Sequence, residues 1–291
     1  MSQAPSIQWF PGHMAKTRRL IKECLPLVDA VAEIRDARIV LSSKNPEIDK
    51  LIGNKKRIII LNKTDFADGE TTKKWCDYYA SKGIKVVCTD SRSGKGVNKF
   101  APAVREVLKE KLEIRKNKGM ATKSLRIMVV GIPNVGKSSF INRLAKGKKA
   151  KVEDRPGVTK GIQWVEVDSS LELLDMPGML WPKFENQTVS EHLAFTGAVK
   201  DDVMDIELLA VRFLELMAKK CPELISERYG IEGFENDEGY DILIKIAKKR
   251  GMLISGGEVN TERAAITVID EFRAGKIGNI SLESPEDIES E

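Results

Sequence analysis

The sequence has few of the residues that build metal clusters, disulfide frameworks or membrane spans. Its 291 residues include four cysteines, none in a C-x-x-C pair, and two histidines, so neither a zinc site nor a disulfide framework is expected. No apolar run approaches the roughly 18 residues of a membrane-spanning helix. Residues 1–10 lack a basic start followed by an apolar core, so they do not predict a secretory signal. We therefore expect a protein of the cytoplasm, with no membrane partner.

The net charge of +5 is mild but unevenly distributed. Residues 109–126 carry seven basic and two acidic side chains, and residues 143–151 add five basic side chains and no acid. Such clusters can contact the phosphate backbone of a nucleic acid, but they can equally be solvated faces, and the sequence leaves both open. Residues 282–291 hold five acids and no base, which predicts a disordered tail at 281–291.

Short β-rich apolar runs alternate with helical patterns in the first part of the chain. The expected strands are residues 28–34, 57–61, 84–88, 125–130, 162–167 and 171–175. The expected helices are residues 70–81, 97–116 and 137–144. This alternation predicts an α/β domain at 1–190, with a mostly parallel sheet, helices on both of its faces and ligands beyond the carboxyl ends of the strands.

Residues 191–280 show helical periodicity without convincing strands. The clearest helices are expected at residues 205–219, 240–249 and 261–274. This segment predicts a separate small all-α domain.

The strongest motif is a phosphate-binding loop (P-loop) at residues 131–138, which fits G-x-x-x-x-G-K-[ST] between a strand pattern and a helix pattern. Its glycines let the backbone N–H groups point at phosphate oxygens, and the following helix adds its positive N-terminal end. Lys137 is expected to reach the β- and γ-phosphates and Ser138 to coordinate Mg²⁺. The residues of this loop expected to contact the nucleotide are Asn134, Val135, Gly136, Lys137, Ser138 and Ser139.

A second motif, Asn62-Lys63-Thr64-Asp65, has the form that reads guanine. Guanine presents its N1–H and 2-amino group side by side, and the Asp65 carboxylate can accept from both, whereas adenine lacks that pair of donors. Asn62 is expected to bond the purine and hold the loop, and the aliphatic stem of Lys63 to cover the base. The residues expected around the base are Asn62, Lys63, Thr64 and Asp65, together with Asp90 and Ser91 after the next strand.

The order of these two motifs is reversed relative to an ordinary Ras-like domain. Asn62 lies 69 residues upstream of Gly131 (131 − 62), whereas the P-loop usually comes first. The fold class expected is therefore a circularly permuted Ras-like domain.

The D-x-P-G motif at residues 175–178 follows a strand, 37 residues beyond Ser138 (175 − 138). Asp175 can hold Mg²⁺ through water, and the Gly178 amide can sense the γ-phosphate. Thr159, between the two motifs, is the natural second hydroxyl for Mg²⁺ and would tie a switch loop to the γ-phosphate.

His13 and Asn134 each have two possible interpretations, and that of His13 depends on Met179. Met179 stands where many GTPases have the glutamine that positions water, and a thioether cannot polarise water. His13 can orient or deprotonate water instead, or it can cap a helix or pack locally. Asn134 can bind a monovalent cation beside the phosphates, or it can simply satisfy its own loop.

Together these motifs resemble the circularly permuted GTPases, and most closely the ribosome biogenesis GTPase A (YlqF) family, over nearly the whole chain. The matching segments are residues 7–16, 36–38, 131–138, 155–159, 175–178, 180–183, 227–230, 249–251 and 255–257. One departure is Val40, where related sequences often have proline, and it affects no residue expected to contact nucleotide.

The resemblance implies a GTPase that acts late in assembly of the large (50S) ribosomal subunit, binds its ribosomal RNA and is released on GTP hydrolysis. It implies GTP and GDP as substrate and product, with Mg²⁺ and K⁺ as cofactors, and a catalytic role for His13. Catalysis is expected to depend on His13, Lys137 and Thr159, with Mg²⁺ on Ser138, Thr159 and Asp175 and K⁺ on Asn134. We expect a monomer whose partners are the subunit precursor and its RNA, with no DNA.

Two alternatives remain at the level of sequence. The protein could be an RNA-binding module that is positioned by GTP occupancy alone, with hydrolysis of little importance. Alternatively, the GTPase could regulate another protein or a tRNA-modifying partner. Because the second switch runs directly into the helical domain, release of the γ-phosphate is expected to shift that domain against its RNA.

Overall fold

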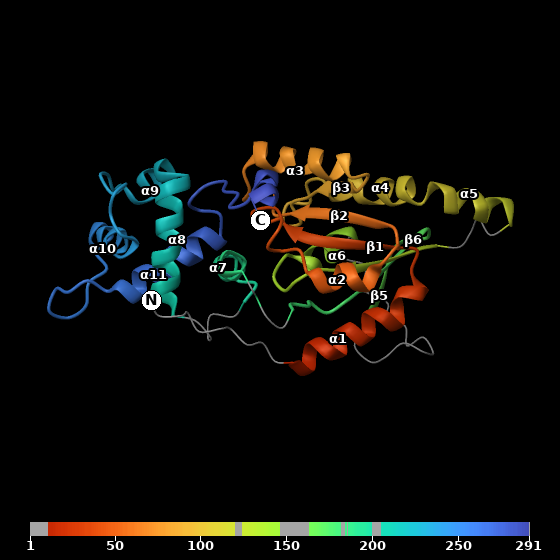
Figure 1. Ribbon diagram of the computed structural model, residues 1–291, viewed down its shortest axis with the longest axis horizontal. Coiled ribbons are helices and arrows are strands. Elements are labelled where there is room, and N and C mark those ends of the chain that lie inside the picture. The colour runs from red at the N-terminus through yellow and green to blue at the C-terminus, as the bar shows by residue number, and fades with distance from the viewer. Residues whose placement is uncertain are drawn as a thin grey trace. The chain divides into compact units, whose positions relative to one another are not determined.

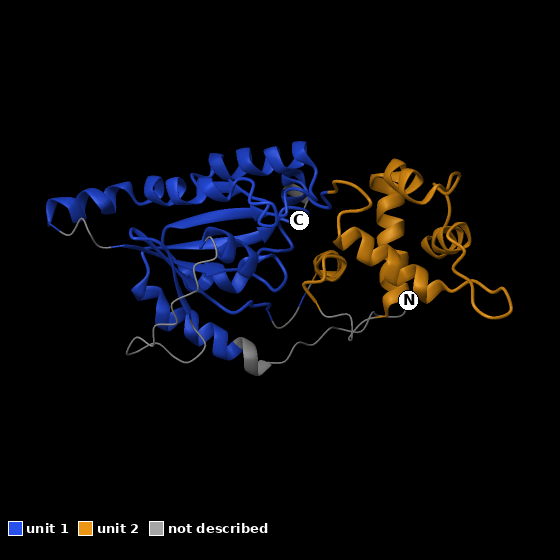
Figure 2. Cartoon of the chain, turned by 180° about the vertical axis from the view of Figure 1, so that it is seen from behind, with its two compact units in different colours: residues 1–185, 281–291 blue, residues 186–280 orange. Residues whose placement is uncertain are grey.

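The computed structural model describes residues 11–119, 124–145, 163–181, 184, 186–199 and 205–290, with the backbone alone at residues 11–14, 289 and 290. The chain forms two compact units. Met1–Glu185 and Ser281–Glu291 make an α/β unit, and Asn186–Ile280 make a helical unit (Figure 2). The boundary lies at residue 186, five residues before the one expected from sequence.

The α/β unit is built on a six-stranded sheet in the order β3-β2-β1-β4-β6-β5 (Figure 1). Its strands are β1 (Ala30–Asp36), β2 (Arg57–Asn62), β3 (Lys85–Cys88), β4 (Leu125–Val130), β5 (Gln163–Asp168) and β6 (Leu171–Asp175). Neighbouring strands are parallel except at the edge, where β5 runs antiparallel to β6. Each expected strand is found within two residues of its expected bounds, and the α/β fold class is confirmed.

Helices cover both faces of the sheet because strand residues alternate between them. On one face α1 (Pro11–Cys24), α2 (Pro46–Ile52) and α3 (Gly69–Ser81) bury apolar side chains against the strands. The opposite face packs against α4 (Phe100–Val107) and α6 (Lys137–Leu144), whose Phe100 and Phe140 rings meet edge to face at 5.2 Å. These layers leave the carboxyl ends of the parallel strands for the loops that carry the motifs.

The sequence pattern predicts one helix at residues 97–116, but the structure divides it. A short 3-10 turn, η2 (Val97–Lys99), precedes α4, and α5 (Lys109–Asn117) follows α4 end to end beyond Leu108 (Figure 1). Leu108 has φ −103° and ψ 15°, outside regular helical values, although its N–H still donates to the carbonyl of Val104. The amphipathic period survives such a local deviation, so the pattern alone does not reveal it.

The helical unit contains α7 (Gln187–Phe195), α8 (Ile206–Lys220), α9 (Pro222–Tyr229), α10 (Gly239–Lys249) and α11 (Thr261–Arg273). The rings of Phe195, Phe213 and Phe272 form its centre, with centroids 5.3 and 4.7 Å apart along that series. Asp205 and Asn260 cap α8 and α11 by accepting hydrogen bonds from first-turn N–H groups. The three expected helices are found here, and α7 and α9 are additional.

The acidic C-terminal segment is packed on the α/β unit, which corrects the expectation of a disordered tail. The Glu283 carboxylate accepts hydrogen bonds from the backbone N–H of Leu41 at 2.6 Å and of Ser42 at 3.1 Å, and Trp75 Nε1 donates to the Glu283 carbonyl. Leu282 is 1% exposed. The 3-10 turn η4 (Pro285–Ser290) lies beside α3 (Figure 1). Acidic composition predicts solvation, but this carboxylate is satisfied by buried backbone donors.

Candidate functional site

The expected motifs gather at the carboxyl ends of four parallel strands. β2 ends at Asn62, β3 leads into Asp90 and Ser91, β4 leads into the loop at 131–136, and β6 ends at Asp175. Because these strands belong to one sheet, segments that are far apart in the sequence meet along one edge.

The loop between β4 and α6 has a backbone that only glycine fits at two positions. Gly136 has φ +92°, and a Cβ added there would lie 2.3 Å from Asn62 Nδ2. Gly131 has φ +154°, and its added Cβ would lie 2.5 Å from the Ile34 carbonyl oxygen. Gly136 is the N-cap of α6 and has no side chain to cap it. The first N–H groups of α6 are therefore available to an anion.

Asn62 joins the guanine motif to the P-loop. Its Nδ2 donates a 2.8 Å hydrogen bond to the Val135 carbonyl, in the loop between β4 and α6. Its Oδ1 accepts from Thr89 Oγ1 at 3.0 Å, from Ser91 N at 3.1 Å and from Ser91 Oγ at 2.7 Å. Asn62 is 1% exposed, so these four contacts satisfy a buried amide. The three segments that follow β2, β3 and β4 are held together by this one side chain.

Lys137 and Asp175 lie on one cavity of about 230 Å³. Its walls are formed by Lys137, Ser138, Gln163, Asp175, Met176, Pro177 and Gly178. Burial lowers the pKa of Lys137 to about 8, against the opposing charge of Asp175, and its Nζ donates to the Ile132 carbonyl at 2.9 Å. Burial also raises the pKa of Asp175, which Lys137 partly offsets. The structure therefore places four expected residues, Lys137, Ser138, Asp175 and Gly178, around one polar cavity.

The base-reading loop is supported by a buried ion cluster that the sequence motifs did not predict. Asp36, at the end of β1, accepts from Arg38 Nη2 at 2.8 Å and pairs with Lys63 Nζ at 3.0 Å. Burial acts to raise the pKa of Asp36, but the charges of Arg38 and Lys63 outweigh it and hold that pKa well below its usual range. The match of residues 36–38 to the family pattern was the available signal. Lys63 is thereby fixed next to Asp65.

Asp65 is half-buried, and burial raises its pKa, with a further contribution from the nearby charge of Asp90. Its Oδ2 lies 3.2 Å from Arg92 Nη2, and the Arg92 guanidinium sits 4.9 Å from the centre of the Phe66 ring. The Arg92 side chain is 75% exposed, so it can leave the carboxylate without losing buried contacts. Thr64 N and Oγ1 both donate to the Thr89 carbonyl, at 3.2 and 3.1 Å.

Met179 lies in the apolar core and away from the cavity. Met179 is 3% exposed, and its N–H donates to the Gly131 carbonyl at 3.2 Å. The Met179 carbonyl accepts a hydrogen bond from Asn45 Nδ2 at 2.7 Å. Both its chemistry and its position exclude it from orienting water at the phosphate cavity. The hydrogen bond from Met179 instead connects the segment after Asp175 to Gly131, the first residue of the P-loop.

Some expected site residues lie outside the described residues. Thr159 and the segment 155–159 fall there, as do residues 7–10, 182 and 183. His13 belongs to the first turn of α1, but its side chain is not described. Among the described residues, Asn134, Ser138 and Ser139 are exposed on the P-loop side of the site, and Asn134 has φ +60°.

The donor set suits a hard cation. Within the described ranges, no three His, Cys, Asp or Glu side chains come close enough to make a metal cluster. Mg²⁺ does not require one, because it is commonly held by one or two carboxylates with waters and substrate phosphates. The Ser138 hydroxyl and the Asp175 carboxylate on one cavity provide such oxygen donors. In the same described part of the chain, the helices are all too short or too polar to cross a membrane.

Comparison with known proteins gives consistent results. A family model described as "50S ribosome-binding GTPase" matches residues 126–229. Ribosome biogenesis GTPase A from Bacillus licheniformis is 47% identical over 282 residues, covering 97% of this chain and 99% of that protein. The GDP-bound structure of TM YlqF matches with a TM-score of 0.64 at 32% identity, covering 92% of this chain and 99% of the other. The GNP-bound YlqF from T. maritima matches with a TM-score of 0.63 at 31% identity, with coverages of 93% and 99%.

Proposed function

The chain belongs to the ribosome biogenesis GTPase A family, and on that premise we propose that it hydrolyses GTP in late assembly of the large (50S) ribosomal subunit. In this proposal the GTP-bound protein binds ribosomal RNA of the subunit precursor in the cytoplasm, and hydrolysis releases it. That the chain is a GTPase, which binds GTP and GDP, is supported by its family model and by its named relatives.

One observation carries the proposal, namely the hydrogen bond from Asn62 Nδ2 to the Val135 carbonyl. A guanine-reading motif and a P-loop can each occur alone. Here a buried 2.8 Å contact between segments 73 positions apart assembles them into one site, in the permuted order that the sequence motifs have.

The phosphates would bind at the N-terminus of α6. The N–H groups of the loop would face the anion, Lys137 would supply positive charge, and Lys137 and Gly178 line the same cavity. An added Cβ on Gly178 would come within 3.0 Å of Lys137 Nζ, so the glycine keeps room for both a phosphate and the ammonium. A bound phosphate also favours the protonated form of Lys137, which burial alone disfavours.

Ser138 and Asp175 would hold Mg²⁺, with Thr159 as the second hydroxyl. When bound, the ion neutralises charge shared by the β- and γ-phosphates. The chain's own contribution is to keep a half-buried carboxylate and a hydroxyl on one cavity, beside Lys137.

The base would bind beside Asp65, with Lys63 held by Asp36 along its face and the loop at Asp90 and Ser91 closing the site. The Asp65 carboxylate would exchange its exposed Arg92 partner for the two donors of guanine. Because an exposed ion pair contributes little, its loss is outweighed by the two charge-assisted hydrogen bonds that guanine donates to the carboxylate.

Since Met179 is buried, the attacking water needs another partner, and we assign that role to His13. We also assign a K⁺ site to Asn134, which is exposed at the P-loop with φ +60°. Asparagine tolerates that backbone conformation by itself, so the cation requirement has to be measured.

The test is GTP hydrolysis by the purified protein, with and without large ribosomal subunits, in K⁺ and in Na⁺. Stimulation by subunits in K⁺ and not in Na⁺ is the expected result. His13→Ala should keep nucleotide affinity and lose about 100-fold in stimulated rate, as expected for a missing general base. Lys22→Ala, an exposed change on the same helix, is its control.

A low rate that neither subunits nor cation change would contradict the proposal. It would favour an occupancy-controlled RNA-binding switch, or regulation of another partner. Retained subunit release in the His13→Ala variant would remove hydrolysis as the release step.

A further inference from the structure

Two cysteine thiols face each other at the end of β3, next to Thr89, which contacts the base-reading loop at Thr64. Cys76 lies on α3 and Cys88 is the last residue of β3, and their Sγ atoms are 3.2 Å apart. Both are free and partly exposed. The other two cysteines differ, because Cys24 is buried in the apolar core and Cys221 belongs to the helical unit.

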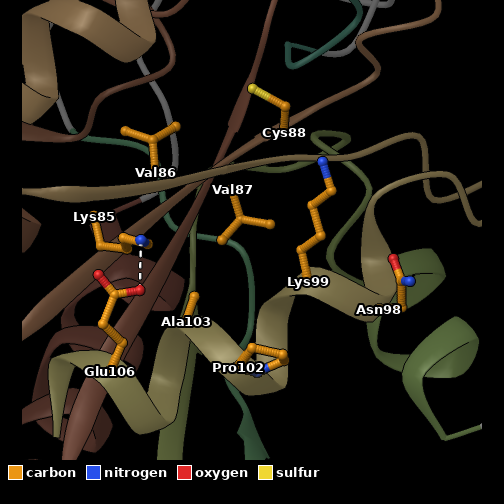
Figure 3. Close-up of a pocket in the computed structure, with 9 residues that line it drawn as sticks. All are labelled: Lys85, Val86, Val87, Cys88, Asn98, Lys99, Pro102, Ala103 and Glu106. Carbon is orange, nitrogen blue, oxygen red and sulfur yellow. Dashed lines mark ion pairs between the residues drawn. The ribbon is translucent and has the colours of Figure 1, made fainter. Parts of the chain in front are cut away.

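The pair lies at an open edge of the sheet. β3 is the edge strand, and a cavity of about 520 Å³ runs along it, lined by β3, Lys99 and α4. Val86 and Cys88 point to one side of β3, whereas Val87 points to the other, toward Pro102 and Ala103 (Figure 3). Cys88 thus turns its sulfur toward the side that α3 covers, at the margin of that cover, where a small oxidant has access.

The contact makes the two sulfurs unequal. Either thiol can be the donor in this contact, which lowers the pKa of the Cys76 thiol and raises that of Cys88. Cys76 is therefore the better nucleophile of the two at neutral pH, since the thiolate is the reactive form.

We propose that Cys76 and Cys88 are a reversible redox modification site. A peroxide oxidises the two thiols to a Cys76–Cys88 disulfide, and the disulfide weakens guanine-nucleotide binding. The Cys76 thiolate attacks one peroxide oxygen, so an S–O bond forms, the O–O bond breaks and hydroxide leaves, which gives a sulfenic acid. Deprotonated Cys88 then attacks Cys76 Sγ, so the S–S bond forms and the S–O bond breaks, and water leaves with the proton of Cys88. The two thiols are oxidised by two electrons and the peroxide is reduced.

The disulfide would act on nucleotide binding through the residues that follow Cys88. Thr89 and Ser91 hold the Asn62 side chain, and the Thr89 carbonyl accepts both hydrogen bonds from Thr64. Bond formation requires the sulfurs to approach by about 1 Å, which draws the end of β3 toward α3. Formation of the disulfide stands independently, whereas its effect on nucleotide rests on the proposed function.

The test uses the full-length protein treated with hydrogen peroxide and then with dithiothreitol. Peptide mapping after alkylation should find a Cys76–Cys88 disulfide, with Cys24 and Cys221 still as thiols. The Kd for GDP should rise by about tenfold on oxidation, which corresponds to one or two lost hydrogen bonds, and should recover on reduction. Cys76→Ser should be insensitive, and Cys221→Ser should behave like the parent protein.

Absence of the disulfide, oxidation to sulfinic acid at either position, or a disulfide that leaves the Kd for GDP unchanged would each overturn the proposal. Failure of the reduced protein to bind GDP would instead contradict the proposed function, and the peptide map would still decide whether the disulfide forms.

Discussion

The side-chain amide of Asn62 donates to the Val135 carbonyl at 2.8 Å, while its oxygen accepts from Thr89 and Ser91. A residue of the guanine motif thus sets the shape of the phosphate loop. The contact joins two motifs that are separated along the sequence by α3, β3, η2, α4, α5 and β4.

Asn62→Ala should therefore weaken both ends of the site. It leaves the Val135 carbonyl and the Ser91 N–H without their buried partner, at a cost of about 1–3 kcal/mol each. We expect at least about tenfold weaker GDP binding and a lower midpoint in urea. Asn54→Ala, at an exposed asparagine, is the control for both measurements. Unchanged GDP affinity would show that the contact is dispensable.

Gly136→Ala should abolish nucleotide binding. The new Cβ would fall 2.3 Å from Asn62 Nδ2, on top of the cost of φ +92°. Gly83→Ala has a matching backbone strain, with φ +70°, and meets no atom within 4 Å. It should lose about 1–2 kcal/mol of stability and keep its affinity for GDP. Equal affinities in the two variants would show that the site accommodates a Cβ at position 136 and that the clash with Asn62 does not prevent binding.

Lys137 should make the nucleotide-free protein less stable at neutral pH. Its pKa is about 8 when folded, against an ordinary 10.5, so between these values the unfolded chain holds a proton that the folded chain lacks. The contribution of Lys137 to the free energy of unfolding therefore rises as the pH increases from 8 to 10.5. It is lost again as the pH falls back to 8. The full shift corresponds to about 3 kcal/mol.

Lys137→Met removes that titration, so its free energy of unfolding should exceed that of the parent protein at pH 7.5 and lose this advantage by pH 10. Urea unfolding of both proteins across that range measures the difference. A difference that does not vary with pH would contradict the assigned pKa. The same variant should fail to bind GDP, because the ammonium at the cavity is gone.

Restoring the usual glutamine at position 179 should not restore rapid hydrolysis. Met179 packs in the core, so Met179→Gln would bury an amide at a cost of about 1–3 kcal/mol without placing it at the phosphate cavity. Met179→Leu keeps the volume and should lose less than about 1.5 kcal/mol. Thermal unfolding and GTP turnover of both variants are the measurements. Faster turnover in the glutamine variant would show that this side chain reaches the site.

Glu283 should stabilise the α/β unit from the far end of the chain. Glu283→Ala would leave the N–H groups of Leu41 and Ser42 without their acceptor, with an expected loss of about 1–3 kcal/mol. Glu286→Gln is the matched change in the same segment, and it weakens an exposed pair with Lys74. It should have no measurable effect on unfolding by urea. Equal losses of stability in the two variants would show that the buried contacts of Glu283 do not stabilise the α/β unit.

The sequence predicts well those features that are written within a short window. Strand bounds, the P-loop and its link to Asp175 depend on local periodicity and on motif spacing, and the structure brings Lys137, Ser138 and Asp175 to one cavity. The capping signal of α2 was also local, because Asn45 precedes Pro46 and caps Glu47, but a seven-residue helix is too short for periodicity to reveal.

Contacts between distant residues were the part that could not be predicted. Glu283 and Ser42 are 241 positions apart, and nothing in an acidic run shows that one of its carboxylates will be buried. The pairing of Asp36 with Lys63 depends on β1 and β2 being neighbours, which is a property of the sheet order. The facing of Cys76 and Cys88 likewise depends on where α3 packs.

Return of the chain to the α/β unit after Ile280 changes the kind of freedom the helical unit has. Residues 186–280 are an insertion tethered at both ends, because the segment on each side belongs to the other unit. A terminal appendage can swing on one pivot, whereas an inserted body must satisfy two anchor points in every orientation. The helical unit is therefore constrained by two connections to the α/β unit, where a terminal domain would have one.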